Sequence, residues 1–191
     1  MQTRSGRTLL ARVSRLRNIK RAWAHLNRGN PGSSGVDDQT IAQFQENLTS
    51  NLASISDRLA AGVYTFSALK AAQIDKKSGG KRPLQVPTVS DRVAFRAILE
   101  IVDRLPHTRR FRNSRYSFAY IRGRPAKALV NRVLELMGRY AWVVETDIIK
   151  YFDRIDQDKL SGQLALMLPD DSLTALLKDA LRAELKFPSW V

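Results

Sequence analysis

The stretch WVVETDIIKYFD, residues 142–153, decides the fold of this chain. Its apolar start predicts a short buried strand that ends at Asp147. A buried carboxylate is costly unless a cation holds it, and a divalent metal bound by oxygen ligands is the simplest such cation. Asp147 is therefore a candidate metal ligand; the alternative is that it caps a helix after the strand. Phe152, an aromatic residue further along, would lie one turn beyond the metal.

A complete two-metal site for phosphoryl transfer needs more carboxylates than this stretch supplies. Asp147 and the backbone carbonyl of Ile148 provide only part of such a site. The tandem pair Asp170-Asp171 is the obvious candidate for the rest. It follows Leu168-Pro169 and precedes a helical pattern, however, and acidic residues in that context stabilise a helix N-terminus. We therefore predict that neither Asp170 nor Asp171 binds metal.

The composition limits the classes of protein to which the chain can belong. With 191 residues, 43% of them hydrophobic, it is long enough for one domain, or one and a part, with a buried core. No apolar run approaches the ~18 residues that a transmembrane helix needs, so we expect no membrane span. The absence of cysteine excludes disulfides and thiolate metal sites and fits a reducing compartment.

Positive charge is concentrated in two blocks of the chain. Residues 1–36 hold eight Lys and Arg and no acid, and residues 80–140 hold fourteen Lys and Arg against four acids, within a net charge of +14. Such blocks predict a polyanionic partner such as nucleic acid, although a solvated surface is an alternative. The Arg-rich N-terminus also fits a mitochondrial targeting peptide.

Hydrophobic periodicity and breakers predict a helix-rich chain with one hairpin. A strand within residues 63–75 and a return strand over 81–87 would flank the turn Ser78-Gly79-Gly80. We expect helices over residues 7–28, 38–61, from Ser90 or Asp91 onward, 125–137, 156–167 and 171–186.

Three basic segments are candidates for binding phosphate. Lys76 and Arg82 flank the hairpin turn and would clamp a triphosphate, unless the turn is simply exposed. Arg92 would either pair with Asp91 or reach a template phosphate. The Arg-rich tract that ends at Arg122 and Arg124 contains interleaved aromatic residues, which offer stacking faces unless they belong to the core.

In their order, these segments resemble the N-terminal half of a reverse transcriptase of the group II intron-encoded and bacterial type. The matching motifs are Gly35-Val36-Asp37, Arg82-Pro83-Leu84-x-Val86-Pro87-Thr88 with Asp91-Arg92-Val93, Ser117-Phe118-Ala119-Tyr120, and Asp147-Ile148 with Phe152-Asp153. The chain departs from the family at Asp38, where glycine is frequent, at Asp75, where proline is frequent, and at Ile121, where arginine is frequent.

The resemblance implies an α+β fold of right-hand polymerase fingers with an incomplete palm. Residues 1–36 would form a basic helix and loop, residues 37–140 a fingers-like region and residues 141–191 a partial palm. It also implies that Asp147 is a catalytic Mg²⁺ ligand, together with the Ile148 carbonyl. Lys76 and Arg82 would bind the dNTP, and Phe152 would be the steric gate that excludes a 2′-hydroxyl. Arg92, Arg122 and Arg124 would contact nucleic acid.

The function implied is that of the N-terminal part of an RNA-directed DNA polymerase, which binds an RNA template, a primer and dNTP. The family's later motifs, a Pro-Gln-Gly-like motif and an aromatic-x-Asp-Asp hairpin, do not occur in residues 1–191. The chain alone is therefore expected to be inactive and to need a complementing polypeptide with the rest of the palm and the thumb. The alternatives are a non-catalytic, maturase-like RNA-binding module and a generic basic DNA-binding protein. We expect a bacterial cytoplasmic location, with the mitochondrion as the alternative.

Overall fold

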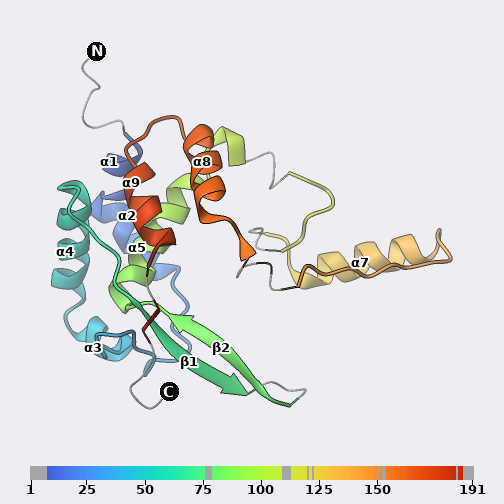
Figure 1. Cartoon of the computed structure of the whole chain (residues 1–191), viewed down its shortest axis with the longest axis horizontal. Coiled ribbons are helices and arrows are strands. Elements are labelled where there is room, and N and C mark those ends of the chain that lie inside the picture. The colour runs from blue at the N-terminus through green and yellow to red at the C-terminus, as the bar shows by residue number, and fades with distance from the viewer. Residues whose placement is uncertain are drawn as a thin grey trace. The chain divides into compact units, whose positions relative to one another are not determined.

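The computed structural model describes residues 8–75, 79–108, 113–119, 121, 123–149, 151, 154–183 and 185–186. The chain divides into two compact units (Figure 1). Unit 1 comprises Met1–Val102 and Gln157–Val191, so the chain leaves this unit and returns to it. Unit 2 comprises Asp103–Asp156. Each unit is described by itself, and the three-part division expected from the sequence stays a prediction.

The N-terminal region of unit 1 contains two helices, where one helix over residues 7–28 was predicted. Helix α1 spans Leu9–Val13 and helix α2 spans Leu16–Ala24. Two side-chain contacts hold the break: Ser56 Oγ donates to the carbonyl of Ser14 at 2.7 Å, and Asn18 Nδ2 donates to that of Val13 at 3.0 Å. The break lets the apolar residues of both helices reach the core.

The second predicted helix, residues 38–61, is likewise divided. Helix α3 spans Ile41–Glu46 and begins with a capping box between Thr40 and Gln43. Helix α4 spans Leu48–Ala60, and the residue between the two helices is Asn47. These helices pack on α1, α2 and α5 of unit 1 around buried aromatic and aliphatic side chains, such as Phe44, which stacks on Trp23 at 5.2 Å between ring centroids.

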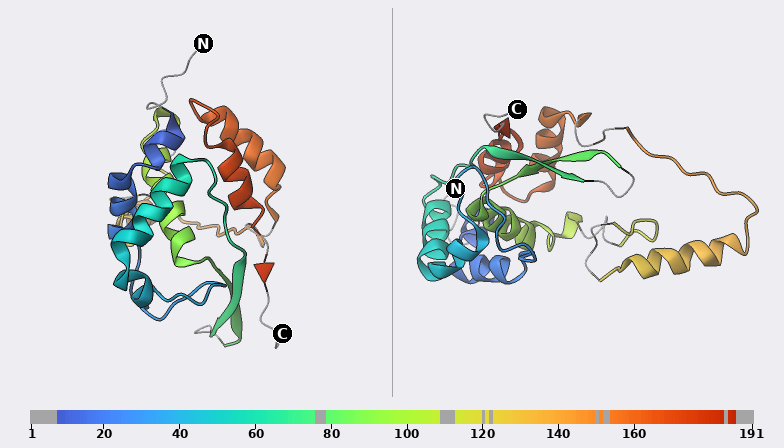
Figure 2. Two further views of the ribbon diagram at one scale, coloured as in Figure 1. Left: turned by 90° about the vertical axis from the view of Figure 1, so that its left-hand side faces the viewer. Right: turned by 90° about the horizontal axis from the view of Figure 1, so that it is seen from below.

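The predicted hairpin is confirmed. Strand β1 (Leu69–Asp75) pairs antiparallel with β2 (Lys81–Val86), with Lys70 opposite Val86 at one end and Asp75 opposite Lys81 at the other. Gly79 and Gly80 in the turn have φ of +85° and +81°, which glycine adopts without strain. The short strand β3 (Leu185–Lys186) pairs in parallel with the start of β1, as both views of Figure 2 show.

Helix α5 spans Val89–Val102, and Thr88 caps it rather than the predicted Ser90 or Asp91. Thr88 Oγ1 accepts from Asp91 N at 3.1 Å, and its hydroxyl donates to Asp91 Oδ2 at 2.7 Å. Asp91 is 2% exposed and also accepts from the Tyr64 hydroxyl at 2.8 Å and from Ser67 N at 3.1 Å. Burial, together with the charge of Asp91, raises the pKa of Tyr64 above its ordinary value. The segment between α4 and β1 and the start of α5 therefore meet at one buried carboxylate.

The C-terminal helices close unit 1. Helix α8 (Gln157–Met167) agrees with its prediction, and α9 (Thr174–Leu181) is shorter than the predicted 171–186. Leu9 N donates to Asp170 Oδ2 at 2.9 Å, and Leu10 N donates to Ser172 Oγ at 3.0 Å, so this segment caps α1. Phe66 N donates to Asp179 Oδ2 at 2.8 Å. As predicted, Asp170 acts at a helix N-terminus, although the helix is α1.

Unit 2 holds helix α7 (Ala126–Met137), close to the predicted 125–137, but not the predicted strand over 142–147. None of the residues of α7 is buried. Residues 142–148 have no strand pairing, and Trp142, Val143 and Val144 are 89%, 73% and 85% exposed. Successive side chains of a strand point to opposite faces, and here both faces are open. The described residues of unit 2 supply neither a partner strand nor a covering layer, which is why the strand prediction was wrong.

No helix within the described residues is long and apolar enough to cross a membrane.

Candidate functional site

The predicted site residues divide between the two units. Arg82 and Arg92 belong to unit 1, whereas Asp147, Ile148 and Arg124 belong to unit 2. Three further predicted residues, Lys76, Arg122 and Phe152, lie outside the described residues.

The hairpin carries Arg82 near its glycine turn. Arg82 lies opposite Ile74 in the β1–β2 register, and both side chains are exposed. Leu84 and Val86, on the same face of β2, are half-buried. Strand β2 therefore packs against the rest of unit 1 at its Val86 end. At its other end it exposes the guanidinium of Arg82 to solvent, where a polyanion could reach it.

The loop before α3 locks the base of this hairpin onto α5. A Cβ added at Gly35 would lie 2.5 Å from the Cα of Thr88 and 2.6 Å from its nitrogen, so only glycine fits there. Asp38 adopts φ of +54°, a left-handed conformation that glycine enters more easily, and its Oδ1 pairs with Lys70 Nζ at 2.6 Å. This geometry explains why glycine is frequent at the position of Asp38 in the family that the sequence resembles.

Arg92 lies at the same junction. Its Nε donates to the carbonyl of Pro87 at 2.9 Å, and one terminal nitrogen is buried without a hydrogen-bond partner among the described residues. Burial lowers the pKa of Arg92. The charge of Asp37 acts in the opposite direction but does not cancel this effect. The alternative ion pair with Asp91 does not form, because the Asp91 carboxylate is held by Tyr64, Ser67 and Thr88. Arg92 therefore keeps unused donor capacity beside the hairpin.

In unit 2, Asp147 and Ile148 lie in the exposed segment after α7. Asp147 accepts no hydrogen bond from the described residues, and α8 begins only at Gln157. The carbonyl of Ile148 accepts from Tyr151 N at 3.2 Å, which leaves it a second lone pair. A carboxylate and a carbonyl are the oxygen ligands that Mg²⁺ takes, so they fit it in kind but not in number. No group of three or more potential metal-binding side chains occurs among the described residues.

Arg124 holds a loop of unit 2. Its guanidinium donates to the carbonyls of Ser114 and Ser117 and lies 5.8 Å from the centroid of the Phe118 ring. Part of its donor capacity is therefore spent on the backbone of residues 114–118. A nucleic-acid contact by Arg124 stays a prediction.

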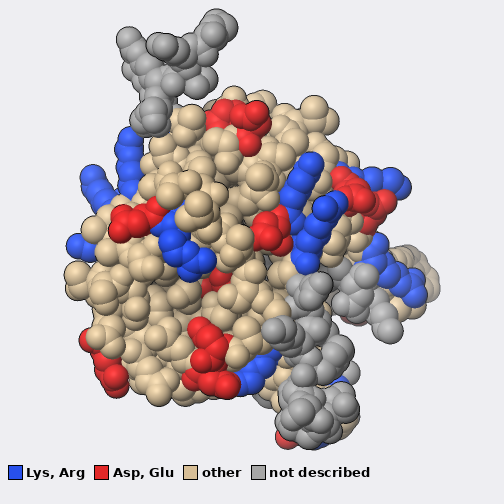
Figure 3. Space-filling model, turned by 60° about the vertical axis from the view of Figure 1, so that its left-hand side comes forward, with Lys and Arg blue, Asp and Glu red and all other residues tan. Residues whose placement is uncertain are grey.

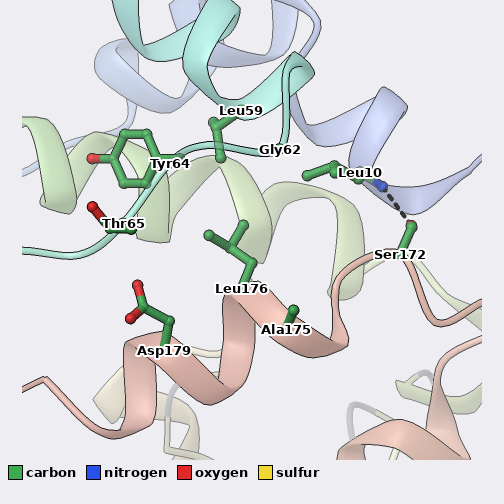
Figure 4. A pocket seen from close by; sticks show the side chains of 9 residues that line it. All are labelled: Leu10, Leu59, Gly62, Tyr64, Thr65, Ser172, Ala175, Leu176 and Asp179. Atoms are coloured by element: carbon green, nitrogen blue, oxygen red, sulfur yellow. Dashed lines mark hydrogen bonds between the residues drawn. The ribbon is translucent and has the colours of Figure 1, made fainter.

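A cavity of about 270 Å³ lies between α1, the end of α4 and α9 (Figure 4). Leu10, Leu59 and Leu176 line it, and its polar groups are largely engaged: Tyr64 with Asp91, and Asp179 with Phe66 N. The cavity therefore marks the seam that joins the C-terminal helices to unit 1 rather than a polar binding site.

The sequence predicted a polyanionic partner for the basic block of residues 1–36 but no particular site within it. The structure gathers four arginines of this block, Arg12, Arg15, Arg17 and Arg21, around one pocket of unit 1. The available signal was their helical spacing without any acid. No acidic side chain lines this pocket, whereas Lys and Arg lie among Asp and Glu on the face drawn in Figure 3.

Comparison with known proteins identifies relatives of the chain. No family model matches it. It is 28% identical over 154 residues to protein YkfC of Escherichia coli, covering 78% of this chain and 40% of YkfC. It is 28% identical over 160 residues to the group II intron-encoded protein LtrA of Lactococcus lactis, covering 81% and 25%. It is 27% identical over 158 residues to an uncharacterized 91 kDa protein in the cob intron of Schizosaccharomyces pombe, covering 82% and 19%.

A solved structure shares the fold. The chain superposes on a Cas6-RT-Cas1–Cas2 complex with a TM-score of 0.51 and 18% identity, over 91% of this chain and 17% of that chain. The fold and the relatives are consistent with a reverse transcriptase-like protein of α+β class. More particularly, its homologues include group II intron-encoded proteins, as the motifs predicted. The chain spans between 19% and 40% of the length of the three relatives above. These relatives come from bacteria and a yeast, so both predicted locations are compatible with them.

Proposed function

We propose that the chain supplies the N-terminal part of an RNA-directed DNA polymerase. Residues 37–140 would form the fingers-like region, and residues 141–191 would form the part of the palm that carries the first metal-binding motif. The observation that carries this proposal is the junction of loop, hairpin and α5. It positions Arg82 at the exposed end of the hairpin and Arg92 at its base, where one buried terminal nitrogen of Arg92 has no hydrogen-bond partner among the described residues.

Each predicted side chain has a role in this proposal. Lys76 and Arg82 hold the triphosphate of the incoming dNTP, because a guanidinium fork matches phosphate oxygens. Arg92, Arg122 and Arg124 contact the RNA template or the primer. Phe152 lies under the sugar and excludes a 2′-hydroxyl.

Asp147 and the Ile148 carbonyl bind Mg²⁺ in the proposed site. The chemistry that Mg²⁺ would supply there is activation of a hydroxyl nucleophile and stabilisation of charge on a leaving oxygen. The residues of this chain hold and orient the reactants. Further ligands must come from elsewhere, since no group of three or more potential metal-binding side chains occurs among the described residues.

The exposed surface of unit 2 supports the need for a complementing polypeptide. Val133, Met137 and Trp142 line an apolar groove of about 230 Å³ beside α7. Exposed apolar surface of this kind marks a place where another protein segment packs. In the proposal, a polypeptide with the rest of the palm and the thumb pairs with residues 142–148 and covers the groove. The chain alone is then catalytically inactive.

Primer extension tests the proposal. The isolated chain, an RNA template, a DNA primer, dNTP and Mg²⁺ should give no extension, whereas a complementing palm and thumb, for instance the corresponding part of YkfC, should restore it. Restored extension should be lost in Asp147→Ala. Robust extension by the chain alone would show that the metal site is complete within it and would overturn the claim of a missing carboxylate.

A second candidate is a maturase-like RNA-binding module without catalysis. The observation that favours it is the single exposed carboxylate at Asp147, with no described partner. This candidate predicts salt-sensitive RNA binding that is unchanged in Asp147→Ala and no extension with any complement. A third candidate, a generic DNA-binding protein, predicts tighter binding to duplex DNA than to RNA of equal length in the same assay.

A further inference from the structure

Four arginines of unit 1 line a pocket of about 220 Å³ together with Asn18 and Ile101. They are Arg12 from α1, Arg15 just before α2, Arg17 in the first turn of α2 and Arg21 in its last turn. No acidic side chain lines this pocket. The junction lies at the start of α5, whereas the one lining residue from that helix, Ile101, lies near its end, so the pocket is a separate feature of unit 1.

The pocket lies at the N-terminus of α2, where positive charge is least favourable. A helix N-terminus carries partial positive charge and free N–H donors, and it normally attracts a polar cap or an acid. Arg15 occupies the cap position without a side-chain cap hydrogen bond, and the first turn contains no acid. Arg17 adds a further positive charge to the same turn. Residues that destabilise the helix in which they lie are typical of functional positions.

Three of the four arginines have no counter-charge among the described residues. The side chains of Arg12, Arg17 and Arg21 form no ion pair or hydrogen bond with any described residue. Beside them, Asn18 is 6% exposed, and its Nδ2 is held by the carbonyls of Val13 and Ala97, each at 3.0 Å. Its Oδ1 is a buried acceptor without a partner.

A bound phosphate would satisfy all of these groups. It accepts from guanidinium forks and from the free N–H groups of the helix terminus. A guanidinium has donors on both edges, so an arginine that binds phosphate through one edge can donate to Asn18 Oδ1 through the other.

We infer that this pocket binds a backbone phosphate of RNA, as a contact additional to Arg82 and Arg92. The inference rests on the proposed function only for the choice of RNA over another phosphate-bearing ligand. In this inference, α1 and α2 provide a second contact with the RNA, separate from the contact at the hairpin.

The test compares two triple variants of the full chain that lose the same charge. One is Arg12→Gln, Arg17→Gln, Arg21→Gln. The control is Lys20→Gln, Lys127→Gln, Lys178→Gln, three exposed lysines outside the pocket. Fluorescence anisotropy with a labelled single-stranded RNA at several salt concentrations gives affinity and salt slope. We expect the arginine variant to bind at least about tenfold more weakly, with the slope of log K against log salt reduced by about 0.7, the contribution of one phosphate on a single strand.

The control should lose less than about threefold in affinity, since it removes only long-range attraction. Equal losses in the two variants would overturn the inference. Because Arg17 is exposed, the single variant Arg17→Glu tests the pocket with little risk to folding, and it should weaken binding more than Lys20→Glu. Unchanged affinity in Arg17→Glu would also overturn the inference.

Two further measurements separate the ligands and the hypotheses. If millimolar inorganic phosphate raises the melting temperature of the wild type but not of the arginine variant, while both bind RNA equally, the site holds a free anion and the RNA assignment fails. If the arginine variant retains RNA binding while Arg82→Gln and Arg92→Gln lose it, this inference fails and the proposed function stands. Failure of the wild type to bind RNA would count against both.

Discussion

The carboxylate of Asp170 accepts a hydrogen bond from the backbone N–H of Leu9, with 2.9 Å between Oδ2 and the nitrogen. The two residues are 161 positions apart, so the return of the chain from unit 2 caps a helix at its beginning. Ser172 reinforces the contact through Leu10 N. Unit 1 is therefore complete only when the segment after residue 156 is present.

We predict that Asp170→Ala lowers the free energy of unfolding by about 1 kcal/mol, the usual cost of a lost helix cap. Urea denaturation followed by circular dichroism measures it. The matched control is Asp171→Ala, because Asp171 is exposed. Its effect should stay within about 0.5 kcal/mol, as for other exposed substitutions. Equal effects of the two variants would contradict the capping role.

The buried carboxylate of Asp91 gives a second prediction. Tyr64→Phe removes the hydroxyl that donates to Asp91 Oδ1 at 2.8 Å. Since the carboxylate is almost fully buried, we expect a loss of about 1.5–3 kcal/mol in the free energy of unfolding. Tyr116→Phe, at a 74% exposed ring, is the control and should change little. A neutral Tyr64→Phe would mean that Ser67 and Thr88 satisfy Asp91 without help.

Local signals in the sequence predicted some elements and missed others for physical reasons. The hairpin was predictable because strand alternation and a glycine turn are both local. The break after Val13 was not, since its stabilising bonds come from Ser56 and from the packing of Asn18 on α5. The prediction of a strand at Trp142 was wrong because a strand needs a partner strand. The periodicity of one segment does not show whether such a partner is present.

The candidate site was predictable in the same partial way. Motif order predicted roles for Arg82, Arg92 and Asp147, since these residues sit at fixed places in short motifs, and those roles stay predictions. The role of Gly35 as a close contact to Thr88 required the three-dimensional structure. So did the pocket around Arg12 and Arg17, because helical periodicity shows a common face but not the packing of α2 against α5.

A third prediction concerns pH. Glu100 is 5% exposed, and burial alone would raise its pKa, but hydrogen bonds from His25 at 2.7 Å and Arg96 at 2.9 Å hold the pKa below its ordinary value of 4.5. A carboxyl with a lowered folded-state pKa stabilises the fold above its unfolded pKa. The stabilisation by ionised Glu100 is therefore complete when the pH is above the ordinary pKa of a glutamate. It is lost as the pH falls below that value and passes through the lowered pKa of the folded state.

Urea midpoints measured from pH 6 down to pH 3 test this prediction. The wild type should lose stability over that range more steeply than Glu100→Gln, in which the titrating group is gone. Glu46→Gln, at an exposed position in α3, is the control and should follow the wild type. Parallel curves for the wild type and Glu100→Gln would show that other carboxyls cause the acid sensitivity.

The contact between Gly35 and Thr88 gives the last prediction. Gly35→Ala would place a Cβ 2.5 Å from the Thr88 Cα, so the loop must move away from the start of α5. We expect a loss of about 1–3 kcal/mol in the free energy of unfolding, the usual cost of overpacking. RNA affinity should fall as well, because the displaced loop and α5 together position Arg92. Gly162→Ala is the control: its Cβ meets nothing within 4 Å in α8, and alanine there should stabilise the helix by about 1 kcal/mol. If Gly35→Ala lowered stability while RNA affinity stayed at the wild-type value, the junction would be a structural support only, and Arg92 would have no part in binding.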